Sequence, residues 1–211
     1  MAGAHENLEH AEHAEHASHS NRKIALLISV IALFLALSET LGKSAQTVGI
    51  ELNIKASDTW NFFQAKTIRQ TSLRIAAEAM VVEVAARPDD EYKKAMTAQI
   101  ERWKATVARY ESDPKEGDGR KELMALARKY EAERDLAMAK YHNYEFASAA
   151  YQIGIVLASA AVITSMMVLA YAAAGVGLIG VLFTGLGLFG PNVMHDLQHW
   201  LETLLQGSGA H

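Results

Sequence analysis

The chain has 211 residues, half of them hydrophobic, and a formal net charge of −4. The lack of a basic excess argues against nucleic acid as a partner, and the lack of cysteine excludes disulfides and thiolate chemistry. The charges are unevenly spread, because no charged residue lies between Ile24 and Leu37 or between Phe146 and Pro191. This segregation predicts membrane-spanning segments on either side of a polar insert.

Residues 1–20 are rich in Ala, Glu and His and lack an apolar face, so we expect a mobile tail or a weak helix. Imidazoles beside glutamates are potential ligands for Zn²⁺, Ni²⁺ or Cu²⁺. The candidate metal ligands in this tail are His5, His10, His13, His16 and His19. A solvated tail that binds no metal explains the same composition, and we favour that interpretation.

Residues 21–42 predict the first transmembrane helix, in which Arg22 and Lys23 precede an apolar run. We expect this anchor to stay uncleaved, because a long polar tail precedes it and no Ala-x-Ala site follows it. Basic residues tend to stay in the cytoplasm, so this pair predicts a cytoplasmic N-terminus and an insert on the opposite side. Glu39 is expected near the headgroups or facing another helix.

Residues 43–145 predict a helical, coiled-coil-like hairpin insert, interrupted near Pro88 and between Pro114 and Gly119. The helix over residues 44–86 carries two rows with a spacing of seven residues. One row is Ile68, Ile75 and Val82, and the other is Phe63, Gln70, Ala77 and Val84. Small side chains flank the first row, at Ala65, Ser72 and Ala79. This combination predicts a close helix–helix contact.

Two further helices complete the predicted insert. The apolar stripe of the second is Tyr92, Met96, Ile100, Trp103, Val107 and Tyr110. The stripe of the third is Leu123, Leu126, Tyr130, Ala137, Tyr141 and Tyr144. The third helix has no helix breaker before the next apolar segment, so we expect it to continue into the membrane.

Residues 146–190 are long enough for a hairpin of two transmembrane helices, and their glycine-rich part predicts a turn near residues 171–177. Ala150, Gly154 and Ala158 form a row of small residues that predicts tight packing within the chain or between subunits. Residues 191–211 predict an amphipathic helix at the membrane surface.

No arrangement of residues predicts catalysis, so we expect no enzyme, no catalytic residue and no cofactor. His195 and His199 are one helical turn apart, as in zinc-protease helices, but Asp196 replaces the glutamate base and no third ligand is evident. A surface helix is the better interpretation. Glu39 and Glu145 are the carboxylates nearest the predicted spans, where headgroup contact is expected.

Two sequence stretches together resemble a known family. Asn21-Arg22-Lys23 enters the first span, and KASDTWNFFQAKTIRQ occupies residues 55–70, with Lys55–Asp58 and Trp60–Lys66 as its most specific parts. With the His/Glu-rich leader and the two C-terminal spans, these stretches resemble the membrane family catalogued as domain of unknown function 4337. The resemblance implies a bacterial inner-membrane protein with three spans, and it supplies no activity, substrate or catalytic residue.

The expected fold is therefore all-α, with three transmembrane helices and a long helical insert between the first and the second. We expect a homo-oligomeric structural or assembly subunit that contacts membrane lipids and a further membrane protein. A small channel or transport accessory protein is the first alternative. A continuous water-filled channel between the helices would favour it. Metal sensing or buffering through the His-rich tail is the second alternative.

Overall fold

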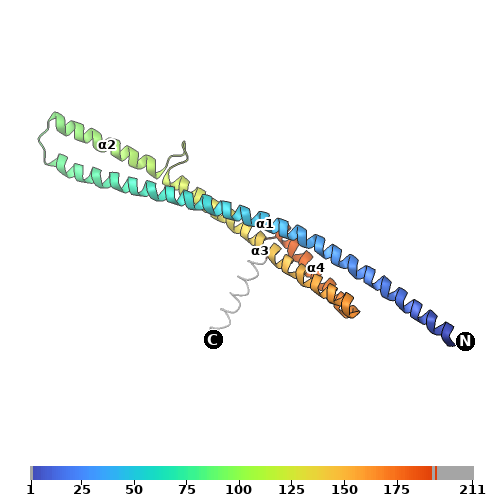
Figure 1. The fold of residues 1–211 in the computed structure, drawn as a ribbon. Coiled ribbons are helices and arrows are strands. Elements are labelled where there is room, and N and C mark those ends of the chain that lie inside the picture. Colours follow the sequence, from blue (N-terminus) through green and yellow to red (C-terminus); the bar gives the residue numbers. More distant parts are fainter. Residues whose placement is uncertain (1, 192, 194–211) are drawn as a thin grey trace, which may run out of the picture. The chain divides into compact units, whose positions relative to one another are not determined.

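The computed structural model describes the backbone of residues 2–191 and 193 and the side chains of residues 22–191 and 193. These residues form four helices and no strand, which confirms the all-α prediction (Figure 1). The helices are α1 (Ala2–Ala85), α2 (Glu91–Glu111), α3 (Arg120–Thr164) and α4 (Met167–Phe189). The amphipathic helix predicted for residues 191–211 lies outside the described residues, apart from its first few positions.

The chain divides into two compact units, and α1 and α3 each run from one unit into the other. We call the first the apolar unit, which comprises Met1–Val48 and Leu136–His211. We call the second the insert unit, which comprises Gly49–Asp135.

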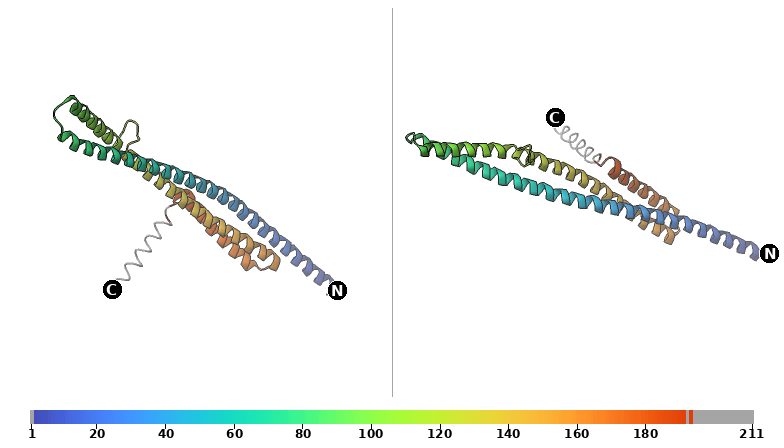
Figure 2. Two further views of the ribbon diagram at one scale, coloured as in Figure 1. Left: turned by 60° about the vertical axis from the view of Figure 1, so that its left-hand side comes forward. Right: turned by 90° about the horizontal axis from the view of Figure 1, so that it is seen from above.

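Three helical stretches among the described residues are long and apolar enough to cross a membrane: Arg22–Ala85, Arg120–Thr164 and Met167–Phe189. Their apolar parts pack together in the apolar unit, where α3 and α4 form a hairpin alongside α1 (Figure 2). Ile24 of α1 packs near the hairpin turn, against the buried side chains Ala158, Ala161, Ala170 and Ala173. Further along α1, Ile31 packs against Ala147 and Tyr151, so α1 and α3 are antiparallel.

The predicted row of small residues in α3 packs within the chain. Ala150, Gly154 and Ala158 are all buried. A Cβ atom added at Gly154 would lie 3.4 Å from the carbonyl oxygen of Ala173 and 3.5 Å from Cδ1 of Ile31. Small side chains therefore let α1, α3 and α4 approach closely, as in other membrane helix packing.

Glycines in α4 make room for two tyrosine rings of α3. A Cβ atom added at Gly180 would lie 2.6 Å from the ring of Tyr151, and one added at Gly187 would lie 2.6 Å from the ring of Tyr144. The hydroxyl group of Tyr151 also lies 3.0 Å from Oγ1 of Thr184, in hydrogen-bonding distance. At these glycines, an aromatic ring of α3 therefore fills the space that a side chain would otherwise occupy.

The turn predicted near residues 171–177 is wrong, because α3 ends at Thr164 and α4 begins at Met167. Ser165 between them has a φ of 56°, in the left-handed region. The apolar part of α3, residues 146–164, is about 28 Å long at about 1.5 Å per residue, close to the thickness of a hydrocarbon layer. The chain therefore turns as soon as this length is reached, and the glycines that suggested a turn lie inside α4.

In the insert unit, α1 packs through positions that alternate in steps of four and three residues. The side chains buried or half-buried along this inner face are Leu52, Ala56, Thr59, Phe63, Lys66, Gln70, Leu73, Ala77, Met80 and Val84. This spacing is a heptad pattern, which keeps one helix face toward its neighbours. The predicted row from Phe63 to Val84 belongs to this inner face, whereas the row from Ile68 to Val82 lies on the opposite side of the helix.

The α2 and α3 helices supply the other side of this core. Asp90 caps α2 by accepting a hydrogen bond of 2.8 Å from the backbone N–H of Lys93. Met96 and Ile100 of the predicted α2 stripe are buried, but Tyr92 is exposed. In α3, Leu126 is exposed and the neighbouring Ala127 is buried, so the predicted stripe is wrong at Leu126.

Candidate functional site

Arg120 at the start of α3 contacts both other helices of the insert unit. Its Nε donates to Oγ1 of Thr67 at 2.9 Å, and its Nη1 donates to Oε1 of Gln70 and Oε2 of Glu111, both at 2.7 Å. The guanidinium also lies over the ring of Phe63, 5.1 Å from its centroid. Because the guanidinium is planar and its donors are fixed in direction, these contacts set the relative positions of α1, α2 and α3.

Gln70 and Glu111 complete this hydrogen-bond network. Gln70 is only 3% exposed, and its Nε2 donates to Oε2 of Glu111 at 3.0 Å and to the carbonyl oxygen of Val107 at 3.1 Å. The hydrogen bond from Gln70, with the nearby charge of Arg120, holds the pKa of Glu111 below its usual value, although partial burial opposes this effect. Glu111 is therefore ionised at neutral pH and attracts Arg120.

Lys66 is the second cation in this region, and it is only 5% exposed. Its Nζ lies 2.6 Å from Oδ2 of Asp118 and faces the rings of Phe62 and Tyr110, 5.5 Å and 5.2 Å from their centroids. A buried ammonium group is stable only with such compensation. We call Lys66, Gln70, Glu111, Asp118 and Arg120 the junction cluster.

The loop between α2 and α3 is held in place by Glu122. Its carboxylate accepts hydrogen bonds from Oγ of Ser112 at 2.6 Å and from the backbone N–H of Asp113 at 3.2 Å. The hydrogen bond from Ser112 is the main reason that the pKa of Glu122 lies below its usual value. Gly119 is required beside it, because a Cβ atom there would overlap the Glu122 carboxylate and the backbone of residues 112–113.

The junction cluster is chemically a set of mutually satisfied groups. Among the described residues, no buried side-chain nitrogen or oxygen lacks a hydrogen-bond partner. The buried polar atoms of the cluster therefore bond to one another, while the side chains of Asp118 and Glu111 are 42% and 41% exposed. Its physical effect is to fix the register of the three helices, since a shift of one helix would leave buried charges unpaired.

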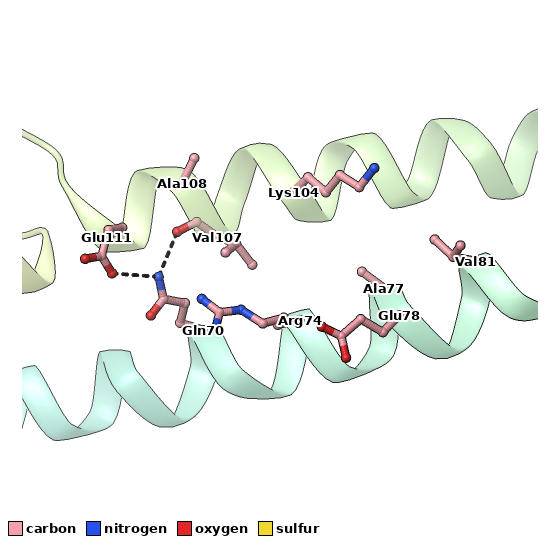
Figure 3. Close-up of a pocket in the computed structure, with 9 residues that line it drawn as sticks. All are labelled: Gln70, Arg74, Ala77, Glu78, Val81, Lys104, Val107, Ala108 and Glu111. Carbon is pink, nitrogen blue, oxygen red and sulfur yellow. Dashed lines mark hydrogen bonds between the residues drawn. The ribbon is translucent and has the colours of Figure 1, made fainter.

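A groove of about 450 Å³ runs between α1 and α2 beside the junction cluster (Figure 3). Its lining residues are Gln70, Arg74, Ala77, Glu78, Val81, Lys104, Val107, Ala108 and Glu111. Ala77 and Ala108 are short, so the two helices leave space between them. In Figure 3 the longer charged side chains lie along the groove, and Gln70 turns toward Glu111.

The opposite face of α1 carries large apolar side chains that the chain itself leaves uncovered. Ile54, Ile68, Ile75 and Val82 are 55%, 67%, 61% and 73% exposed, and we call them the outer row. Ser72 and Ala79 beside this row are also exposed. The helix contact predicted for this row is therefore not made within the chain, so the row is the main candidate for an interaction surface.

Glu39 and Glu145, the two carboxylates nearest the apolar segments, line one pocket of about 320 Å³ in the apolar unit. Lys43 lines the same pocket. Nearby, the buried Oγ of Ser38 donates to the carbonyl oxygen of Tyr144 at 3.0 Å. Charged side chains thus gather at the end of the apolar unit where α1 and α3 leave it.

The predicted metal ligands are not placed by the structure. The side chains of His5, His10, His13, His16 and His19 lie outside the described residues, as do His195 and His199. Among the side chains that are described, no three His, Asp or Glu residues are arranged to hold a metal ion. Metal binding by the tail stays a prediction.

The junction cluster was not predicted from the sequence. Gln70 was placed in a heptad row without a role, and no role was expected for Lys66 or Arg120. A signal was available, because Lys66 and Gln70 are polar residues at positions of a heptad seam that are normally apolar. Their partners on α2 and α3 have no such periodic signal, since they lie at helix ends and in a loop.

Fold and site together define an all-helical protein with three helices apolar enough to cross a membrane and a helical insert fixed by a buried ionic cluster. A family model described as a domain of unknown function, number 4337, matches residues 20–190. The match covers most of the chain, so the chain belongs to this family, as its resemblance suggested. No curated protein and no solved structure matches the chain.

Proposed function

We propose that this protein is a self-associating scaffold of the bacterial inner membrane, anchored by three helices and joined to further copies through its insert. The observation that carries the proposal is the outer row on α1, four large aliphatic side chains that remain exposed although the inner face of the same helix is packed. A helix normally has one apolar stripe facing its own core. A second stripe at heptad spacing is typical of a helix that contacts another molecule.

The energetics of burial support this role. Burying one fully exposed Ile or Val side chain contributes about 1.5–3 kcal/mol. A contact between two copies buries the outer row of each copy. Ser72 and Ala79 flank the row with small side chains, so another helix can approach closely. Membrane lipids are expected to surround the exposed apolar side chains of α4, such as Leu178 and Leu182.

The packing of the apolar unit favours a scaffold over a channel. The contacts among α1, α3 and α4 consist of Ile, Ala and Gly with interleaved tyrosine rings. Such contacts exclude water, whereas a conducting path requires polar groups along its length. The charged pocket near Glu39 lies at one end of these helices.

In this proposal the N-terminus is cytoplasmic and the insert lies on the periplasmic side. Ile24 packs beside the α3–α4 turn, so Arg22 and Lys23 belong to the same end of the apolar unit as that turn. Ser38 and Tyr144 meet at the other end, where α1 and α3 continue into the insert unit. Basic residues beside the first span tend to remain in the cytoplasm.

Thiol labelling tests the orientation, because the chain has no native cysteine. Ser18→Cys and Lys115→Cys would each be probed with a membrane-impermeant maleimide in intact spheroplasts. We expect labelling at position 115 and none at position 18 until the membrane is opened. Labelling at position 18 but not at position 115 would reverse the assignment and place the insert in the cytoplasm.

Self-association is tested with two differently tagged full-length copies expressed together. We expect both to remain in the membrane after a carbonate wash and to co-purify after detergent extraction. Replacing Ile68 and Ile75 with Glu should reduce co-purification about tenfold or more, since unpaired carboxylates oppose burial. Ala105→Glu, on the exposed face of α2, is the control and should have no effect. If the wild-type copies do not co-purify, the proposal is wrong.

A further inference from the structure

Charged side chains flank the outer row in a symmetric order. Arg69 and Glu83 lie seven residues before and seven residues after Ala76, on one flank of the row. Arg74 and Glu78 lie two residues before and two residues after Ala76, on the other flank. Each flank is therefore basic on the N-terminal side of Ala76 and acidic on its C-terminal side.

These charges are available for contacts outside the chain. Within the part of the chain that the structure describes, Arg69, Arg74 and Glu78 are exposed and form no ion pair, and Arg74 and Glu78 also line the open groove between α1 and α2. Glu83 approaches only Arg87, at 3.4 Å, and both side chains are largely exposed. An exposed pair of this kind contributes little free energy, so Glu83 can exchange its partner at low cost.

We infer that the outer row binds a second copy of the same chain in the antiparallel direction, about a two-fold axis near Ala76. This inference rests on the proposed self-association and specifies its geometry. The charged pairs are centred on Ala76 and the apolar pairs on Ile75, so the axis lies between these two residues and facing positions agree in height to within about 1.5 Å, the rise of one residue. Arg69 of each copy then faces Glu83 of the other. On the other flank, at a greater angle around the helix from the outer row, Arg74 of each copy approaches Glu78 of the other. Each of these four charges thus meets an opposite charge.

The apolar residues match in the same arrangement. Ile75 lies next to the axis and meets its own counterpart, and Ile68 of one copy meets Val82 of the other. Ser72 meets Ala79, so a small side chain always faces another small side chain. Two helices with this pattern approach closely while their large aliphatic side chains interdigitate.

A parallel pair in register is disfavoured by the same residues. In parallel coiled coils, charged residues on opposite flanks meet when they are five positions apart. Glu78 of each copy would then face Glu83 of the other, which brings like charges together twice. Charge complementarity therefore selects the antiparallel direction.

Antiparallel pairing sends the two α1 helices out of the contact in opposite directions. In detergent the copies turn freely, so the pairing is tested there without regard to the membrane arrangement.

Disulfide crosslinking of the full-length protein distinguishes the two directions. Ser72→Cys and Ala79→Cys chains, carrying different tags, would be mixed in detergent and oxidised with copper phenanthroline. We expect a mixed disulfide between positions 72 and 79 and about tenfold less product from either variant alone. Two copies of position 72 are displaced by about 10 Å along an antiparallel pair, too far for a disulfide, which needs Cα atoms about 4.4–6.8 Å apart.

A charge reversal tests the flanking pairs when it is introduced into both the Ser72→Cys and the Ala79→Cys chains. Arg69→Glu should lower the yield of mixed disulfide about tenfold, because it replaces two attractions with two repulsions. Adding Glu83→Arg to the same chain should restore the yield, since every pair again has opposite charges. Both positions are exposed, so the helical content measured by circular dichroism should stay unchanged.

The outcomes separate this inference from the proposed function. Efficient self-linking of Ser72→Cys alone indicates a parallel pair and overturns the antiparallel geometry, while self-association stands. Failure of the mixed disulfide in a preparation whose tagged copies still co-purify overturns the use of the outer row. Failure of both crosslinking and co-purification overturns the proposed function as well.

Discussion

Replacement of Arg120 by Met is expected to lower the free energy of unfolding by about 3 kcal/mol, because it removes three charge-assisted hydrogen bonds and leaves Glu111 partly buried without its cation. The side chain of Arg120 is 25% exposed, so water compensates for part of the lost interaction. The loss would be measured by urea unfolding of the full-length protein in mild detergent, followed by far-ultraviolet circular dichroism.

Arg128→Met is the matched control for this experiment. Arg128 lies on the same helix, is exposed, and forms no ion pair or side-chain hydrogen bond with the described residues. Its replacement should change the free energy of unfolding by less than about 0.5 kcal/mol. Equal losses for the two variants would show that the junction cluster does not hold the insert together.

Gly180→Ala is expected to destabilise the apolar unit by about 2 kcal/mol, because its Cβ atom would overlap the ring of Tyr151 and force α3 and α4 apart. The measurement is the midpoint of thermal unfolding in detergent. Gly187→Ala should have a similar effect through Tyr144, whose ring occupies the corresponding space.

Gly175→Ala is the control, since nothing lies within 4 Å of a Cβ atom placed there. Alanine has a higher helix propensity than glycine by about 1 kcal/mol in soluble helices, so this variant should be neutral or more stable. The two glycine variants are therefore expected to differ in sign. A gain in stability from Gly180→Ala equal to that of Gly175→Ala would show that Tyr151 does not occupy this space.

The overall architecture was predictable because hydrophobic burial and helix breakers leave local traces in the sequence. The uncharged stretches marked the three apolar helices, and Pro88 and Pro114 marked the ends of the insert helices. The position of the α3–α4 turn was missed, because glycine suggests a turn as readily as it suggests close packing. Only the rings of Tyr144 and Tyr151, which come from another helix, distinguish the two.

The choice between the two heptad rows of α1 was not predictable from local sequence. The outer row is the more apolar of the two, so periodicity alone favours it as the buried face. The chain instead buries the row that contains Gln70, together with Lys66, because α2 and α3 bring Glu111, Asp118 and Arg120 to compensate them. Such compensation depends on residues 40 or more positions away, whose approach the sequence does not reveal.

The measurement that tests self-association most directly is the protein mass of the detergent-extracted assembly, by light scattering with the detergent contribution subtracted. The wild type is expected to have a mass of at least two chains, in detergent and in nanodiscs. The variant with both Ile68→Glu and Ile75→Glu is expected to have the mass of a single chain. A wild-type protein that is strictly monomeric in both environments would rule out self-association, since the outer row would then have no second copy to cover it.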